Sequence, residues 1–380
     1  MPFEQSVSHA PGTSLAITKR IVASLPQSVG AMPAASQAFV AALRSCNTPS
    51  AYSHPVATRN AGLVPAWLDW TACRKGKPEN ESTADQLIAD PQYRFDECAK
   101  VIERAISVDS VWKNIVRNAG SHHQPEMGVD LVTAPLMFWR RPHALIELTP
   151  TLQQLLARSD LGNDISVALL SPPMPACFIR FGEEMQHGAL MPHLDGFAFR
   201  RIDGVYVFQT TFAGERGLAL VAIYNVDNHL GLGISGITVV IRDEGELLVH
   251  VIDRISTKMN PEHRAHHQAL AQMCTKVFLY WNVEQARRVV ETPYSNAIQQ
   301  LKQLGPKKAA KLRRRMDSLY DRILLGPLAL PEFSFAPHGE VSPHWRRGHF
   351  RMQPHGPHQS LRKVIFIAPT LVRADRLDAK

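Results

Sequence analysis

The chain has 380 residues, of which 45% are hydrophobic and 20% are charged, and its formal net charge is +8. This length suits two or three domains, and the composition excludes an intrinsically disordered chain because it can bury real cores. The charge is uneven: residues 301–380 hold sixteen Lys or Arg residues against six Asp or Glu residues, so they carry +10 and the first 300 residues carry about −2. This asymmetry favours a nucleic acid or another polyanion as a partner, with a solvated basic surface as the alternative.

Cysteine usage and hydropathy indicate a cytosolic protein. The five cysteines are scattered and include no C-x-x-C pair, so we expect reduced, mostly buried thiols. No run approaches the roughly eighteen consecutive apolar residues of a membrane helix. The apolar run at 15–25 is broken by Lys19 and Arg20, which is not the layout of a secretory signal, and a transit peptide is the weaker alternative. We therefore predict a cytoplasmic location and no membrane contact.

The first 170 residues are predicted to form an N-terminal segment followed by a helical domain. Residues 1–60 are rich in Pro, Ser and Ala, which favours a loosely ordered arm. In residues 61–170, apolar side chains recur at three- and four-residue spacing, for example over 93–108. Thr149 before a proline is typical of an N-cap and predicts a helix over 151–158. Three tryptophans are expected to anchor the core: Trp67, Trp70 and Trp112.

The hydrophobic period changes to two in residues 171–300, which predicts an α+β domain. Four strands without intervening helices favour an antiparallel sheet, and they are expected at 176–181, 204–212, 218–224 and 237–241. A further strand is expected at 247–252. A helix over 261–291 then carries a packed apolar stripe of Leu270, Met273, Val277 and Trp281. The central sheet is therefore expected to pack on long helices.

Residues 301–380 are predicted to form a basic module of one helix and one β-hairpin. The helix is expected over 307–325, with an apolar stripe of Leu312, Met316, Leu319 and Ile323. The opposite face would be a cationic ridge of Lys307, Lys311 and Arg314, flanked by Arg315 and Arg322. The hairpin would place 343–351 beside 361–367, with a Gly-Pro turn between them. The second strand is apolar enough for us to expect burial on both of its faces.

Two motifs are reminiscent of a cofactor or metal site, and neither has the required context. Residues 231–236 match G-x-G-x-x-G, but a β-branched run follows where a dinucleotide site needs a helix. His263 and His267 lie one helical turn apart, but Glu262 precedes the first histidine, whereas the zinc-protease pattern needs a glutamate after it. A solvated helix start is favoured. We therefore predict no cofactor and no bound metal.

A group of acids follows the strand at 176–181. Glu183, Glu184 and Asp195 are expected near one edge of the sheet, together with His193. Such a group is compatible with acid–base catalysis or with an acidic cleft that recognises a basic peptide. Ordinary loop charges are the simpler explanation. For the peptide hypothesis, Glu183, Glu184 and Asp195 are the predicted binding residues.

Histidines and arginines alternate in residues 338–358. In one hypothesis His344 and His349 are the general acid and base of a metal-independent ribonuclease. Phosphate contact explains the same residues without catalysis, because cationic side chains release counterions from a nucleic-acid backbone. The predicted nucleic-acid-binding residues are Lys307, Lys311, Arg314, Arg315, Arg346, Arg347, His349, Arg351, Arg362 and Lys363. A basic surface that contacts only protein is the remaining alternative.

The run Pro-His-Trp-Arg-Arg-Gly-His-Phe-Arg at 343–351 and the Ser-Leu-Arg-Lys segment at 360–363 resemble a C-terminal module of bacterial proteins carried by phages, plasmids and integrated elements. The proline-led strand at 172–181 resembles the same proteins. They include the anti-CRISPR family directed at biogenesis of the type V-A CRISPR effector nuclease. The resemblance implies a protein that engages the N-terminal segment of the nascent effector and promotes loss of its messenger RNA. It carries over no catalytic residues.

Together these patterns predict an α+β protein with a helical N-terminal part, a central antiparallel sheet and a basic C-terminal module over 301–380. We predict a non-enzymatic regulatory binding protein of a mobile element, which recognises a polypeptide and contacts RNA or the ribosome. The alternatives are a histidine-dependent ribonuclease and a protein-only interaction subunit.

Overall fold

The computed structural model describes residues 54–60, 62–72, 84–107, 126–186, 188–191, 193–194, 197–226, 231–329 and 344–372. Most of the N-terminal segment predicted over 1–60 therefore lies outside the described residues, as do Trp112 and Asp195.

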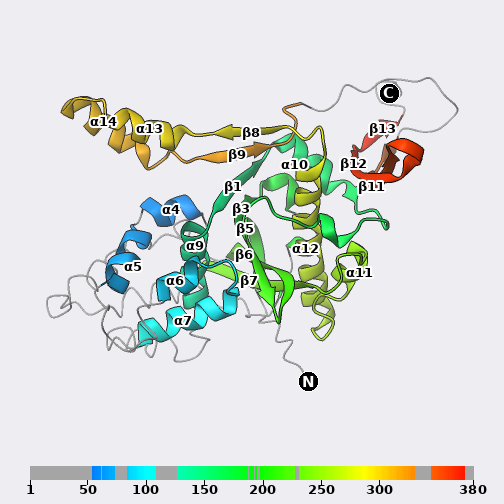
Figure 1. The fold of residues 1–380 in the computed structure, drawn as a ribbon, viewed down its shortest axis with the longest axis horizontal. Helices are drawn as coiled ribbons and strands as arrows, with labels where there is room; N and C mark the ends of the chain where they lie inside the picture. Colours follow the sequence, from blue (N-terminus) through cyan, green and yellow to red (C-terminus); the bar gives the residue numbers. More distant parts are fainter. Residues whose placement is uncertain are drawn as a thin grey trace.

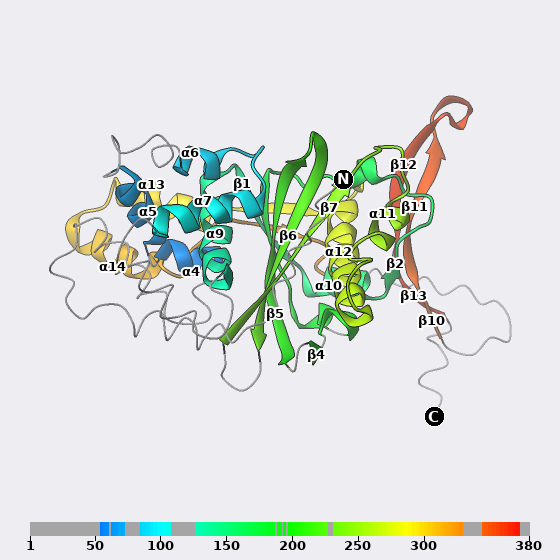
Figure 2. The same ribbon diagram turned by 90° about the horizontal axis from the view of Figure 1, so that it is seen from below.

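Helices cover both faces of one large sheet, so the molecule has three layers (Figure 2). One face is covered by α4 (Pro55–Asn60), α5 (Leu63–Ala72), α6 (Ala84–Ala89), α7 (Phe95–Ser107) and α9 (Glu126–Arg140). The other face is covered by α10 (Pro150–Ala157), α11 (Leu248–Asp253) and α12 (Pro261–Asn282). This arrangement confirms the predicted α+β class.

The sheet joins strands from distant parts of the sequence, in the order β7-β6-β5-β3-β1-β9-β8. The strands are β1 (His143–Leu148), β3 (Ala176–Arg180), β5 (Phe197–Phe212), β6 (Glu215–Val226), β7 (Gly231–Ile241), β8 (Arg288–Glu291) and β9 (Arg322–Leu325), and β4 (His193–Leu194) also pairs with β5. The β5-β6-β7 meander is antiparallel, as predicted. However, β1 runs parallel to both β3 and β9, so the sheet is mixed. The sequence patterns place β1 in a helical region and β9 in a helix.

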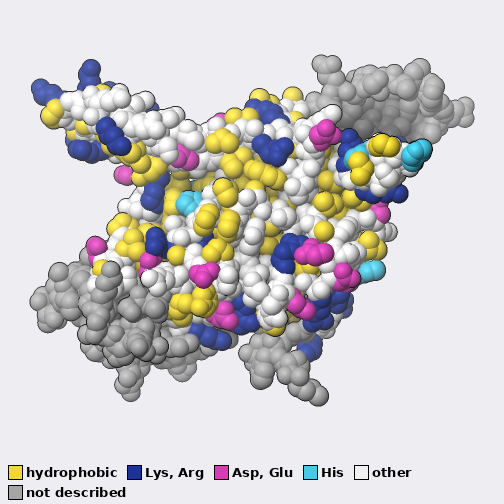
Figure 3. Space-filling view, in the orientation of Figure 1, with side chains coloured by type: hydrophobic (Ala, Val, Ile, Leu, Met, Phe, Trp, Pro, Cys, Tyr) yellow, Lys and Arg dark blue, Asp and Glu magenta, His cyan; other side chains and the backbone are white. Residues whose placement is uncertain are grey.

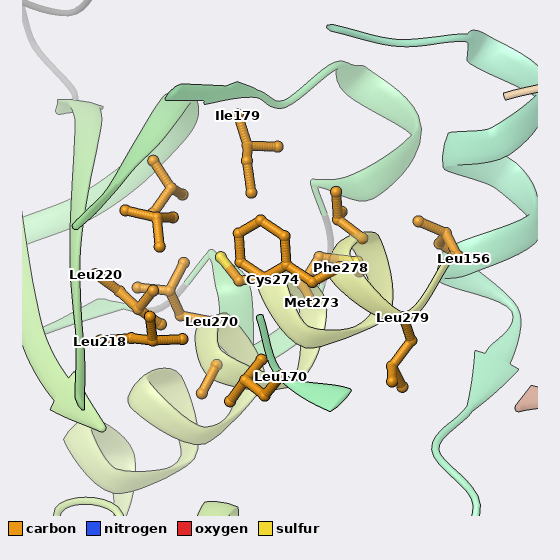
Figure 4. Packing of buried hydrophobic residues seen from close by; sticks show 14 of the residues in the cluster. Leu156, Leu170, Ile179, Leu218, Leu220, Leu270, Met273, Cys274, Phe278 and Leu279 are labelled. Carbon is orange, nitrogen blue, oxygen red and sulfur yellow. The ribbon is translucent and has the colours of Figure 1, made fainter. Parts of the chain in front are cut away.

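The hydrophobic core is divided by the sheet into two clusters. In the first cluster, α12 packs against Ile179 of β3 and against β6 (Figure 4). Its contacting side chains include Leu270, Met273, Cys274 and Phe278. In the second, helices α4 to α9 pack on the opposite face of the sheet around Trp67, whose side chain is fully buried. Both the predicted stripe on α12 and the predicted role of Trp67 are confirmed. The described cysteines, Cys98, Cys177 and Cys274, are buried and form no disulfide.

Three predicted elements have the wrong type or length. Residues 248–253 form the helix α11 where we expected a strand. Helix α12 ends at Asn282 instead of continuing to residue 291, and its C-terminal neighbour β8 is a strand. The helix expected over 307–325 ends at Met316, and Arg322–Leu325 is the strand β9. Short apolar runs fit either period, and here pairing with β1 and β8 decides the outcome.

Beyond the sheet, β8 and β9 lead to two helices, α13 (Pro293–Leu301) and α14 (Pro306–Met316). Figure 1 shows this pair projecting from the molecule above α4. We call residues 292–321 the helical arm. Its two ends are joined because Asp321 Oδ1 accepts hydrogen bonds from the backbone N–H groups of Tyr294 (3.0 Å) and Ser295 (3.1 Å), in the manner of a helix cap.

The predicted C-terminal hairpin is confirmed: β11 (Gly348–His355) pairs antiparallel with β12 (Leu361–Ile367). The short strand β2 (Ser159–Asp160) extends it, and β10 (His344–Arg346) pairs with β13 (Thr370–Val372). Phe350 is fully buried against Phe366, which also contacts Tyr280 of α12. The expected burial of β12 on both faces is wrong, because only one face of the hairpin meets the body. Within this strand only Val364 is buried, and Leu361 is 52% exposed.

Candidate functional site

Charged side chains meet where the parallel strands β1 and β3 end. Glu147 and Arg180 are direct neighbours in the register of these two strands. Glu147 is only 8% exposed, and its carboxylate accepts hydrogen bonds from Tyr320 Oη (2.6 Å), Arg180 Nη1 (3.0 Å) and Arg322 Nη1 (2.6 Å). Arg322 also pairs with Glu291 across β8 and β9 (2.7 Å). Arg322 therefore belongs to this cluster and not to the flank of the cationic ridge, where the sequence pattern predicts it.

This hydrogen bonding decides the charge state of Glu147. Burial alone would raise the pKa of its carboxyl group. The hydrogen bonds from Tyr320 and Arg180, together with the positive charges of Arg322 and Arg180, outweigh burial and lower the pKa. Glu147 is therefore ionised at neutral pH, and it holds Arg180 and Tyr320 in fixed positions.

Beside this cluster lies a cleft with a volume of about 590 Å³. Figure 3 shows the molecule hollowed between the helical arm and the body. The cleft is bounded by α4, by the start of α10, by the ends of β1 and β3, and by the turn that joins α14 to β9. Its charged lining residues are Glu147, Glu183, Asp203, Asp317, Arg180 and Arg201. Charges of both signs therefore face one hollow.

Two buried polar atoms in the lining have no hydrogen-bond partner among the described residues: His54 Nε2 and Gln153 Oε1. Gln153 is 7% exposed, and its Nε2 donates to the Leu148 carbonyl (2.9 Å). Gly182 makes room for this amide, since a Cβ atom at residue 182 would lie 2.2 Å from Gln153 Oε1. Polar atoms buried without partners are uncommon in folded proteins, so both atoms call for an explanation.

The cleft wall formed by α4 also holds the helical arm. Arg59 donates to the Leu319 carbonyl (2.8 Å), and its guanidinium lies 3.7 Å from the centre of the Tyr294 ring. Asn60 donates to the Asp317 carbonyl, just after α14 ends. Helix α4 is therefore in contact with the root of the arm and with the cleft at the same time.

Residues 146–374 match a family model, AcrVA2-like, described as the Anti-CRISPR type V subtype A2 family. The match covers more than half of the chain, from β1 to β13. The chain belongs to the AcrVA2-like family. The crystal structure of AcrVA2 is similar to 84% of this chain and 99% of its own, with 12% identity and a TM-score of 0.44. Among curated proteins, none matches.

This assignment confirms the resemblance to an anti-CRISPR family. The matched range includes Glu147, Gln153 and Arg180 but not His54, which contributes to the opposite wall of the cleft. The wider module that we related to proteins of phages and plasmids stays a prediction.

In this AcrVA2-like chain the three acids predicted to bind peptide lie in different situations. Glu183, in the short helical turn η3 (Glu183–Met185), lines the cleft. Glu184 is exposed on the same turn but does not line the cleft, and Asp195 lies outside the described residues. The sequence prediction missed His54, Glu147 and Gln153. Only the acids Glu183 and Glu184, which follow the strand predicted at 176–181, pointed to this region.

The predicted nucleic-acid-binding residues form two groups that are far apart. Lys307, Lys311, Arg314 and Arg315 are on α14, whereas the others are on the β10–β12 hairpin region at the opposite end of the molecule (Figure 1). In the hairpin, Arg347 pairs with Asp160 (3.4 Å) and Lys363 with Glu284 (2.9 Å). Arg346, Arg351 and Arg362 are exposed, His349 is half-buried, and the side chain of His344 lies outside the described set.

The solvated helix start expected around His263 is wrong. His263, His266 and His267 are all buried beneath the sheet at the start of α12. His266 Nε2 lies 2.8 Å from Tyr224 Oη, and His267 contacts the hydroxyl groups of Ser235 and Ser256.

Within the described residues, no three His, Cys, Asp or Glu side chains are arranged to hold a metal ion. Among the described helices, none combines the length and hydropathy needed to cross a bilayer.

Proposed function

We propose that this AcrVA2-like protein is an anti-CRISPR inhibitor that works by binding, without catalysis, and recognises an extended polypeptide segment in the cleft. The resemblance found in the sequence suggests which segment: the N-terminal part of a type V-A effector nuclease, met as a nascent chain. The family assignment supports the anti-CRISPR role. The polypeptide ligand is supported by the chemistry of the cleft.

The observation that carries this proposal is the combination of charges and buried polar atoms in one hollow. A small anion would need mainly donors, and a metal ion mainly acceptors. The cleft instead offers four carboxylates, two guanidinium groups, a histidine, two glutamines and an asparagine. The guanidinium groups of Arg180 and Arg201 pair with Glu147 and Asp203, which leaves Glu183 and Asp317 as the carboxylates without an ion pair to either arginine. Its volume of about 590 Å³ lies within the usual range of ligand sites. A polypeptide segment, with donors and acceptors along its length, is the ligand class that fits a lining with both kinds of group.

The test is a titration of the purified protein with a synthetic peptide of the effector's N-terminal sequence, followed by fluorescence anisotropy. Reversing the charge at the cleft lining with Glu183→Lys is expected to weaken binding about tenfold, or about 1.4 kcal/mol. Glu184→Lys is the matched control, because Glu184 is also exposed on the same turn but does not line the cleft. Its affinity should stay near that of the parent protein.

The proposal fails if the parent protein does not distinguish this peptide from a scrambled one. It also fails if both charge reversals have the same effect, because the peptide would then respond to overall charge and not to the cleft.

A second function, contact with RNA or the ribosome, is favoured by α14. Residues 293–316 contain seven Lys or Arg residues and no acid, and all seven are exposed. Five of them, Lys307, Lys308, Lys311, Arg314 and Arg315, fall within an arc of about 120° on the helix. We propose that this face binds the phosphate backbone. Filter binding of labelled RNA at rising salt concentration tests this proposal. If the protein retains no RNA even at low salt, the proposal is wrong. The ribonuclease and protein-only alternatives stay predictions.

A further inference from the structure

Two atoms of the cleft, His54 Nε2 and Gln153 Oε1, have no hydrogen-bond partner among the described residues, although the His54 ring itself packs edge-on against Phe178 and Tyr320. They belong to different walls: His54 immediately precedes α4, and Gln153 is in the first turns of α10. Both are covered by protein and lack partners within the described structure. An unpaired buried polar atom destabilises the folded state, so two of them beside one cleft indicate atoms kept for a ligand.

The existing hydrogen bonds assign the role of each atom. The Val56 backbone N–H donates to His54 Nδ1 (3.2 Å), so Nδ1 carries no proton. Burial and the charge of Arg180 lower the pKa of His54 to about 4, so the ring is neutral at pH 7 and its proton lies on Nε2. His54 Nε2 is therefore a donor.

For Gln153, the bond from Nε2 to the Leu148 carbonyl identifies which end of the amide is nitrogen. The opposite orientation would place two carbonyl oxygens against each other. Gln153 Oε1 is therefore an acceptor, and Gly182 leaves the space in which it sits. The cleft thus contains one unused donor and one unused acceptor.

We infer that His54 and Gln153 form a clamp for the polypeptide main chain, in which Gln153 Oε1 accepts from a backbone N–H and His54 Nε2 donates to a backbone carbonyl of the bound segment. A backbone carries one donor and one acceptor per residue, which matches this pair, whereas a phosphate or an ammonium group would use only half of it. Both residues line the cleft, but the two atoms themselves are covered by protein, so a local opening of the cleft wall at His54 and α4 is part of the inference. It rests on the proposed function of the cleft.

The clamp makes a prediction that separates binding from folding. Gln153→Met keeps the size of the side chain and removes both polar atoms of the amide. It is expected to weaken binding of the effector N-terminal peptide at least about tenfold, while the melting temperature changes little, because removal of the unpaired oxygen offsets the lost hydrogen bond to the Leu148 carbonyl. His54→Phe should also weaken binding from the other wall, and its melting temperature should fall because the Val56 N–H loses its acceptor Nδ1.

A peptide series in which single backbone nitrogens are methylated identifies the main-chain contact itself. In the parent protein, methylation at one position should cost about as much affinity as Gln153→Met. In the Gln153→Met protein that same methylation should cost nothing further. A merely structural glutamine would not produce this loss of additivity.

The inference is overturned if Gln153→Met and His54→Phe leave peptide affinity unchanged, because the two atoms would then be structural. If Glu183→Lys still weakens binding in that case, the cleft remains the peptide site and only the clamp is wrong. If the parent protein binds no effector peptide, the proposed function and the clamp fail together.

Discussion

The buried histidines of α12 show how single residues link stability to pH. His266 Nε2 faces Tyr224 Oη, and its Nδ1 lies 3.0 Å from the Ala189 carbonyl. His267 Nδ1 lies 2.6 Å from Ser256 Oγ and its Nε2 3.2 Å from Ser235 Oγ. Burial lowers the pKa of His266 to about 4 and that of His267 to about 3. Both rings are neutral in the folded protein, where each makes a hydrogen bond at both of its nitrogens.

Stability is therefore expected to fall as the pH drops below about 6.5, the ordinary histidine value. The unfolded chain takes up protons there, whereas the folded protein does so only near pH 3–4. Each histidine should cost up to about 1.4 kcal/mol of unfolding free energy per pH unit in this window. Urea denaturation at pH 5, 6 and 7 measures the slope.

The matched variants for this slope are His266→Gln and His358→Gln. His266→Gln should remove about one proton from the proton uptake on unfolding and so make the slope of unfolding free energy against pH less steep. His358→Gln should leave the slope unchanged, because His358 is exposed. Equal stability of the parent protein at pH 5 and pH 7 would contradict the interpretation.

At the scale of elements, the basic C-terminal region divides into two unlike surfaces. On α14 the cations are exposed on a helix whose other side packs through Ala309. Among the described residues, no carboxylate pairs with them, and their nearest acid in sequence, Asp317, follows the helix. In the hairpin, by contrast, Asp160 and Glu284 neutralise two of the cations. Figure 3 shows Lys and Arg side chains gathered over the arm. For this reason α14 is the stronger candidate for phosphate contact.

Neutralising Lys307, Lys311 and Arg314 together with glutamine should reduce the salt dependence of RNA binding. Each lost phosphate contact lowers the slope of log affinity against log salt by roughly 0.7, so the triple variant should lose about 2. Glutamine preserves the helix. The same triple change at the exposed hairpin residues Arg346, Arg351 and Arg362 is the control and should leave the slope unchanged. A larger loss of slope in the hairpin variant would show that the RNA-binding surface is on the hairpin and not on α14.

At the scale of the whole molecule, the helical arm projects from the sheet but is fastened to the body through α4. Arg59 stacks on Tyr294 and bonds the Leu319 carbonyl, while residues of the same helix line the cleft. A movement of α4 on peptide binding would therefore shift the residues that it contacts in the helical arm, Leu319 and Tyr294. The cleft and the cationic helix are physically connected even though they are different sites.

Arg59→Ala is expected to loosen this connection. Loss of the ring contact and of the hydrogen bond, about 1–2 kcal/mol together, should speed backbone hydrogen exchange of α13 and α14 roughly tenfold. Exchange in α12 should be unaffected. Arg94→Ala, which removes a comparable contact over the Phe212 ring away from the arm, serves as the control. Unchanged exchange in the arm of the Arg59→Ala protein would show that the arm is held by other contacts.

Local patterns were sufficient to predict the α+β class, the β5-β6-β7 meander, the stripe on α12, the capped helix α10 and the C-terminal hairpin. Each of these depends on periodicity, turn residues or a cap, which are encoded within one short segment. The same patterns misassigned 247–252 and 317–325, since a short apolar run has no period of its own. Their type depends on the neighbours that they meet in the folded chain.

The cleft is a product of the tertiary structure. Its parts come from residues as far apart as His54, Glu147, Arg180 and Tyr320, and they meet only because β1 lies between β3 and β9. Charge per segment is additive along a chain, so the basic C-terminal fifth was visible in the sequence. Its division into a hairpin with two neutralised cations and a helix with none among the described residues was not, because the neutralising carboxylates Asp160 and Glu284 come from outside that segment.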